Sequence, residues 1–168
     1  MEEKRKFRVA VITSSDSGYK GEREDVSGPA IEEILQADGE YEVVQKIILP
    51  DDFAMLRASM MKICDEGTAD LILTTGGTGF SPRDIMPEMR KEICDRMVPG
   101  IPEAMRAYSM TITKRAMLSR AESGIRRRTL IINMPGSPKA VKESLEYILP
   151  ALGHGLEILL SMTSNCAR

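Results

Sequence analysis

"LILTTGGTGFSPRDIMPE", residues 71–88, joins a short apolar run to a loop with three glycines among the four residues 76–79. The apolar run predicts a strand. Glycine costs roughly 0.5–1 kcal/mol relative to alanine inside regular structure, so a glycine cluster at a strand end indicates unusual backbone dihedrals or a close approach to another group. Helical spacing begins at Ile85. The stretch is therefore one strand–loop–helix unit of the kind that builds α/β proteins.

Similar units recur along the chain, without repeats or low-complexity linkers. Strands are predicted at residues 7–13, 41–49, 69–75 and 129–134. Helices are predicted from a Ser27 cap, from Asp52 to just before Gly67, over 85–114 with a break at 99–102, and as two closing helices that begin at Pro138 and Pro150. This alternation is typical of an α/β fold, and 168 residues fit a single domain over 1–168.

The composition excludes several classes of protein. No apolar stretch approaches the roughly 18 residues that span a bilayer, and the charged N-terminus lacks the apolar region of a signal peptide, so we expect a cytoplasmic protein. A net charge of -2, 4% aromatic residues and no tryptophan disfavour nucleic-acid binding. Cys64, Cys94 and Cys166 lack the spacing of a disulfide framework or a zinc site, and His154 has no nearby partner for catalysis.

The loops that follow the predicted strands hold most of the polar and glycine-rich motifs. They are SSDSGYKGEREDVSG at 14–28, PDD at 50–52, GGTGFSPRD at 76–84 and PGSPK at 135–139. In open parallel sheets, ligands bind in the crevice beyond the carboxyl ends of the strands. We therefore expect these four loops to share one edge of the sheet and to form the binding site.

The glycine loop fits neither the P-loop pattern nor the dinucleotide pattern G-x-G-x-x-G, because its spacing differs from both. Successive backbone N–H groups near a helix N-terminus can still bind an anion. The loop at 135–139 has the same features, with Ser137 as a predicted cap and Lys139 nearby. Either loop alone is more simply a tight turn, but two on one edge favour an anion site.

Asp51 and Asp84 are the candidate metal ligands, since each lies in a loop after a strand. Carboxylates beside a phosphate repel it unless a cation lies between them, and Mg²⁺ is commonly held by one or two carboxylates together with phosphates. The alternative, that both are helix caps or solvated acids, stays open on spacing alone. Asp16 and Asp25 are weaker candidates because a polar loop uses such residues in turns, and residues 126–128 are interpreted as a solvated turn or edge.

In these motifs and their order, the chain resembles the molybdopterin adenylyltransferase family, which includes the gephyrin G domain. The resemblance covers nearly the full length and is carried by SDSGYKGEREDVSG, ILPDD, TTGGTGFSPRD, GIPEAMR and MLSRAESGIRRRTLIINMPGSPKAVKE. It implies a three-layer α/β/α sandwich with a mostly parallel sheet that binds molybdopterin and Mg-ATP. It also implies transfer of AMP to the terminal phosphate of the pterin, hand-over to a molybdate-inserting protein, and a homotrimer.

The resemblance also implies roles for individual residues. Asp51 and Asp84 match the two functional aspartates, and Asp51 favours the active branch over a bacterial sister branch in which the acid of the ILPD segment can be absent. Many relatives carry an arginine or asparagine soon after the serine–aspartate of the first loop, and this chain departs from that pattern. The matching substrate-binding positions are Gly76, Gly77, Thr78, Gly79, Pro135, Gly136, Ser137, Pro138, Ser15, Asp16, Ser27, Glu103 and Ser119.

Two other functions compete with adenylyl transfer. A non-enzymatic pterin-binding or scaffold protein has the same motifs, and pyrophosphate release separates the two. A nicotinamide-dependent dehydrogenase shares only the strand–glycine–helix unit and lacks G-x-G-x-x-G. For the homotrimer, Leu152, Leu156 and Leu159 are predicted to supply a subunit face.

Overall fold

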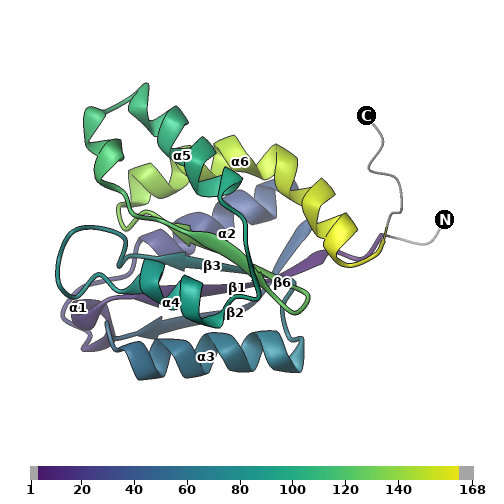
Figure 1. Cartoon of the computed structure of the whole chain (residues 1–168), viewed down its shortest axis with the longest axis horizontal. Helices are drawn as coiled ribbons and strands as arrows, with labels where there is room; N and C mark the ends of the chain where they lie inside the picture. Colours follow the sequence, from purple (N-terminus) through teal and green to yellow (C-terminus); the bar gives the residue numbers. More distant parts are fainter. Residues whose placement is uncertain (1–3, 163–168) are drawn as a thin grey trace.

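The computed structural model describes residues 4–162, and six strands in it form one sheet (Figure 1). The strands are β1 (Phe7–Ser14), β2 (Tyr41–Leu49), β3 (Leu71–Thr75), β4 (Arg96–Met97), β5 (Ser123–Arg126) and β6 (Thr129–Met134). Their order across the sheet is β2-β1-β3-β6-β5-β4. The first four in this order are parallel, whereas β5 is antiparallel to both β6 and β4. The mostly parallel sheet is as predicted.

The helices form a layer on each face of the sheet. They are α1 (Asp16–Tyr19), α2 (Ser27–Asp38), α3 (Phe53–Glu66), α4 (Met86–Ile93), α5 (Gly100–Met110), the 3-10 helix η1 (Lys114–Leu118) and α6 (Pro138–Leu159). In Figure 1, α2, α5 and α6 cover one face, and α3 and α4 cover the other. The three-layer α/β/α sandwich is therefore confirmed.

Two apolar cores follow from the alternation of side chains along the central strands. Val9 and Val11 of β1 pack into the core that contains Leu145 of α6. Ile12, which points to the opposite face, packs with Leu56 of α3. All five side chains are essentially inaccessible to solvent, and burying each is worth about 1.5–3 kcal/mol. Burial on both faces explains why the central strands have nearly continuous apolar sequences.

The two closing helices predicted from Pro138 and Pro150 are one helix. Pro150 lies inside α6, which runs over 22 residues. An interior proline removes a backbone hydrogen bond and costs about 3 kcal/mol. The buried stripe of α6 runs from Leu149 past Pro150 to Leu152 and Leu156, so packing against the sheet outweighs this cost. For the same reason the predicted subunit face is wrong in part, because Leu152 and Leu156 are buried within the chain.

The region between α4 and β6 also differs from the prediction. The predicted helical stretch over 85–114 is divided into α4, the two-residue strand β4 and α5. β5 and β6 form a hairpin in which Arg127 adopts a positive φ of 52°. Arg127 therefore lies in a turn, as interpreted from the sequence, but Arg126 belongs to β5 and is ion-paired with Asp65.

Within residues 4–162, no helix is both long and apolar enough to cross a membrane. Cys64 and Cys94 are free thiols, and burial raises the pKa of Cys64 to about 11. Cys166 lies outside the described residues.

Candidate active site

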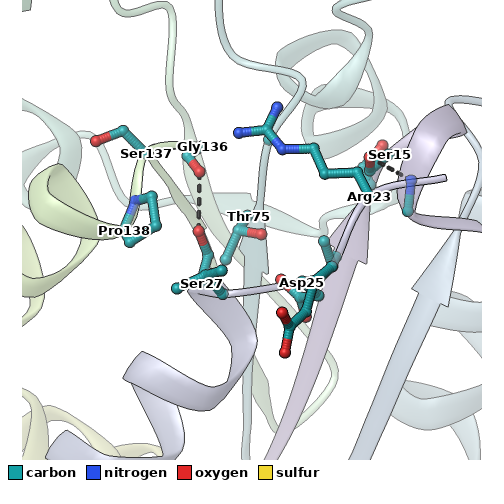
Figure 2. Close-up of a pocket in the computed structure, with 14 residues that line it drawn as sticks. Ser15, Arg23, Asp25, Ser27, Thr75, Gly136, Ser137 and Pro138 are labelled. Carbon is teal, nitrogen blue, oxygen red and sulfur yellow. Dashed lines mark hydrogen bonds between the residues drawn. The ribbon is translucent and has the colours of Figure 1, made fainter. Parts of the chain in front are cut away.

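A cavity of about 380 Å³ opens at the carboxyl ends of β1 and β3 (Figure 2). β1 and β3 are neighbours, but the chain after β1 leads to α2 on one face of the sheet and the chain after β3 leads to α4 on the other (Figure 1). Open α/β sheets bind ligands at such a switch point. The cavity is lined by the β1–α2 segment and by the loops after β3 and β6. Of the residues predicted to bind substrate, its walls include Ser15, Ser27, Gly76, Gly136, Ser137 and Pro138.

The glycines after β3 have both features that their clustering indicated: unusual backbone dihedrals and a close approach to other groups. Gly76 and Gly77 have positive φ values of 86° and 70°. A Cβ on Gly76 would lie 2.5 Å from the carbonyl oxygen of Ser14, and one on Gly77 would lie 2.6 Å from Cγ of Met86. Any side chain at these two positions would force the loop apart.

The same loop leaves its donors unused. The N–H groups of Gly77, Thr78 and Gly79 donate to no residue among the described 4–162. The loop after β6 lies beside it, since a Cβ on Gly136 would be 3.6 Å from Cα of Gly76. Adjacent runs of available N–H groups form a concavity suited to phosphate or another anion.

The loop after β6 is held by two serines. Ser137 caps α6 as predicted, and its hydroxyl accepts a hydrogen bond from the N–H of Ala140 at 3.2 Å. Ser27 was predicted to cap α2, and this is wrong, because Val26 occupies the cap position. The Ser27 hydroxyl instead donates to the carbonyl oxygen of Gly136 at 2.9 Å (Figure 2), which ties α2 to the second loop.

The β1–α2 segment supplies the charges of the cavity. Ser15 caps α1 by accepting from the N–H of Gly18 at 3.0 Å. Asp25 accepts from the Thr13 hydroxyl at 2.9 Å, so it is bound to β1. The Arg23 side chain extends over the cavity in Figure 2, and no described residue accepts a hydrogen bond or ion pair from its guanidinium. Arg23 is thus a cation available to an anionic ligand.

Asp51 lies next to the cavity because it is hydrogen-bonded to Ser14 at the end of β1. The Ser14 hydroxyl, which belongs to a residue of the cavity wall, donates to Asp51 Oδ1 at 2.5 Å. It is not a helix cap, since Asp52 caps α3 by accepting from the N–H of Met55. Asp84 lies in the loop after β3 and accepts from the N–H of Ser81 through Oδ2 at 2.8 Å. Asp51 Oδ2 and Asp84 Oδ1 accept from no described residue, so each carboxylate keeps one oxygen for a ligand.

Arg83 connects the loops of the two aspartates. Its guanidinium donates to Asp16 Oδ1 at 2.9 Å and to the carbonyl oxygen of Asp51 at 3.0 Å. The hydrogen bond from Arg83, together with one from the Asp51 N–H, lowers the pKa of Asp16. Asp16 therefore stays ionised and serves to fix these loops, although it does not line the cavity.

A second cavity of about 240 Å³ lies on the other side of the loop after β6, with mostly apolar walls. It includes the predicted residues Ser119 and Pro135. Ser144 also lines it, and the buried Ser144 hydroxyl has no hydrogen-bond partner among the described residues. Glu103 is exposed on α5 and lines neither cavity.

Sequence reasoning assigned no role to Arg23 or Arg83. Arg83 is part of the motif GGTGFSPRD, so its place in a loop after a predicted strand could have indicated a role at the site. Arg23 lies among charged residues at 22–25, where nothing in the spacing distinguishes a residue that faces the cavity from one that faces solvent.

The fold and this cavity define an α/β sandwich with a candidate binding site at the switch point of its sheet. The chain belongs to the family whose model is described as "Probable molybdopterin binding domain", which matches residues 10–154. The family inferred from the sequence motifs is thereby confirmed.

Three relatives illustrate the similarity. Molybdopterin adenylyltransferase of Helicobacter pylori (strain J99) is 41% identical over 160 residues, covering 92% of this chain and 88% of that protein. Gephyrin of Dictyostelium discoideum is 41% identical over 162 residues, covering 91% of this chain and 22% of gephyrin. The crystal structure of the molybdopterin biosynthesis enzyme MoaB from Thermus thermophilus has a TM-score of 0.87 and 46% identity, covering 92% of this chain and 97% of that one.

Proposed function

We propose that this chain is a nucleotidyltransferase of molybdenum cofactor biosynthesis that transfers AMP from ATP to molybdopterin and releases pyrophosphate. The observation that carries the proposal is the pair of adjacent loops at the switch point, with available N–H groups at residues 77–79. Both substrates are phosphate esters, and these loops suit two phosphates that must approach each other. The similarity to a molybdopterin adenylyltransferase over most of the chain supports the same reaction.

In this reaction a phosphate oxygen of molybdopterin attacks the α-phosphorus of ATP in line, and the bond to the pyrophosphate oxygen breaks. No protein nucleophile is needed, so catalysis comes from positioning and charge neutralisation. The N–H groups of the two loops bind phosphate oxygens, and Arg23 offsets the negative charge of the triphosphate. The hydrogen bonds of Ser27 with Gly136 and of Ser14 with Asp51 help to orient these loops.

Two carboxylates beside the cavity, which neither of them lines, support a magnesium site. Asp51 and Asp84 each keep a carboxylate oxygen without a protein partner among the described residues, and Mg²⁺ takes one or two such oxygens together with phosphates. These two aspartates would hold the ion. When bound, it supplies positive charge that offsets the charge developing on the phosphate oxygens.

The second cavity suits the ring system of molybdopterin. Its apolar walls match the faces of a planar heterocycle. The loop after β6 separates the two cavities, with Pro135 on one side and Gly136 on the other. A ring in the second cavity therefore places its phosphate tail near the loops that bind the nucleotide.

We further propose that the protein acts in the cytoplasm as a homotrimer and passes its product to a molybdate-inserting protein. An apolar groove of about 500 Å³ between α5 and α6, lined by Ile101, Tyr147 and Leu159 among others, supports a subunit contact. Tyr147 is 51% exposed and stacks on Tyr108. Light scattering is expected to give a trimer, and a monomer at micromolar concentration would contradict this.

The alternative function is a non-enzymatic pterin-binding or scaffold protein of the same family. Incubation with molybdopterin and Mg-ATP, with pyrophosphate measured, decides between them. Adenylyl transfer predicts pyrophosphate that depends on both substrates, and one adenylylated pterin for each pyrophosphate. Binding of molybdopterin with no pyrophosphate above the level of ATP alone would establish the scaffold function instead.

A further inference from the structure

Arg120 contacts the glycine loop at more points than any group that sequence reasoning singled out. Its backbone N–H donates to the carbonyl oxygen of Thr78 at 2.9 Å. Its side chain donates through Nε to the carbonyl oxygen of Gly79 at 2.8 Å and through Nη2 to that of Asp84 at 2.7 Å. Nη1 is ion-paired with Glu88 in the first turn of α4. One residue, 36 positions from Asp84, therefore joins both ends of the loop to α4.

These contacts occupy carbonyl acceptors of the loop and leave its N–H donors available. The carbonyl of Gly77 accepts from the N–H of Met86, and those of Thr78, Gly79 and Asp84 accept from Arg120. The N–H groups of Gly77, Thr78 and Gly79 donate to no described residue. A peptide carbonyl turned toward a phosphate would repel it, so binding an anion requires this arrangement. A glycine-rich loop has little rotamer or backbone restriction of its own to maintain it.

We propose that Arg120 is the positioning residue of the site: it binds the carbonyls of the glycine loop so that the loop's N–H groups and the Asp84 carboxylate remain available to the substrates. The inference rests on the proposed adenylyl transfer for its effect on turnover. A lysine cannot replace the guanidinium, because a single ammonium lacks the planar fork that reaches two carbonyls and a carboxylate together. The positive charge adds a favourable field for phosphates, but the geometry is the main effect.

The test uses Arg120→Met and Arg120→Lys, with Arg57→Met as the matched control. Arg57 is ion-paired with Glu92 of α4 at 2.6 Å, so its removal also takes an arginine–glutamate pair from α4 but touches no carbonyl of the loop. Turnover per folded molecule is expected to fall about 100-fold in Arg120→Met, as a displacement of about 1 Å typically costs, and to remain within threefold in Arg57→Met. Arg120→Lys is expected to fall about tenfold. KM for ATP rises less than kcat falls, since the loop after β6 still binds phosphate.

Two readouts separate positioning from a general loss of stability. Guanidinium chloride at millimolar concentration is expected to restore part of the turnover of Arg120→Met, whereas sodium chloride at the same ionic strength is not. Amide hydrogen exchange of the free protein is expected to accelerate over residues 76–86 and to be unchanged in α3. Turnover that falls only with the folded fraction, no rescue by guanidinium, or wild-type exchange in the loop would each overturn the proposal. If the wild-type protein releases no pyrophosphate, adenylyl transfer fails, but the hydrogen exchange of the loop still decides the role of Arg120.

Discussion

The Ser14 hydroxyl donates a hydrogen bond to Asp51 Oδ1 at 2.5 Å, and this contact joins the carboxyl ends of β1 and β2. Ser14 also supplies the carbonyl oxygen against which Gly76 packs. One residue at the end of β1 therefore sets both the orientation of a candidate metal ligand and the closest approach of the glycine loop. Substitutions that separate charge from orientation at this contact test the role of Asp51.

Asp51→Asn is expected to lower turnover by about 10²–10³, because it removes the negative charge while its amide oxygen can still accept from Ser14. Ser14→Ala keeps the charge and loses the hydrogen bond, so we expect a smaller decrease of about tenfold and a loss of roughly 1 kcal/mol in the free energy of unfolding. Turnover and urea unfolding on both variants provide the measurement. Wild-type turnover in Asp51→Asn would show that Asp51 only connects the two strands.

Arg23→Ala is expected to weaken ATP binding by about tenfold or more, since a hydrogen bond to a charged group is worth about 1.5–3 kcal/mol. The melting temperature is expected to stay unchanged, because the Arg23 guanidinium makes no hydrogen bond or ion pair with a described residue. Calorimetric titration with ATP at low and high salt provides the measurement. Arg96→Ala, which removes an exposed arginine on β4, is the charge-matched control. Equal ATP affinity in the two variants would exclude a role for Arg23.

The central part of the fold was predictable because its signals are local. The strands at 7–13 and 129–134 are apolar runs that burial on both faces requires, and the helix from Asp52 has a cap and an apolar face. β5 and β4 were not predicted, because they are short, include polar residues such as Ser123 and Arg126, and exist through pairing: β5 pairs with β6, and β4 pairs with β5. The predicted helix start at Pro150 is wrong for the opposite reason, because tertiary packing outweighs this local signal and Pro150 lies inside α6.

The site was predictable only as far as topology determines it. Loops after parallel strands must share an edge, so the approach of Gly76 to Gly136 follows from the order of elements. The contacts that orient these loops join residues far apart in the sequence, such as Arg120 with Gly79 and Ser27 with Gly136. No periodicity or spacing reports such pairs, and the same lack of information led to the incorrect cap at Ser27.

Asp70 at the opposite edge of the sheet provides a test of stability that is independent of the site. It is 2% exposed and accepts hydrogen bonds from the side chains of Arg5 and Arg8. Burial alone raises the pKa of Asp70, but the hydrogen bonds from Arg5 and Arg8 outweigh it and lower the pKa from 3.8 to about 2. The folded state therefore binds the proton less well than the unfolded state does. The resulting stabilisation, about 2 kcal/mol, is present above pH 4 and is lost as the pH falls toward 2.

Asp70→Asn is accordingly expected to lose about 2 kcal/mol of unfolding free energy at pH 7 and to show a weaker pH dependence between pH 4 and 2. Urea unfolding across this range gives the comparison. Glu66→Gln, which changes an exposed carboxylate on the same edge, serves as the control and is expected to behave like the wild type. A wild-type pH profile in Asp70→Asn would show that Arg5 and Arg8 do not stabilise the ionised form.

Asp84→Asn separates the two roles that the structure allows for Asp84. Its Oδ2 accepts from the N–H of Ser81, which is a turn contact, and its Oδ1 has no described partner. If the carboxylate holds Mg²⁺, the isosteric amide keeps the turn but loses the anion that anchors the cation. Turnover then falls by about 10²–10³, and binding of molybdopterin, supplied mainly by backbone N–H groups, is retained.

If Asp84 only closes the turn, the same variant behaves differently, because asparagine can also accept from the Ser81 N–H and little stability is lost. Turnover per folded molecule then stays near the wild-type value. Asp84→Ala removes both the turn contact and the charge, and is expected to lower the melting temperature as well as turnover. Melting temperature, molybdopterin affinity and pyrophosphate release measured on both variants therefore assign Asp84: an Asn variant with normal turnover and affinity would refute its role as a metal ligand.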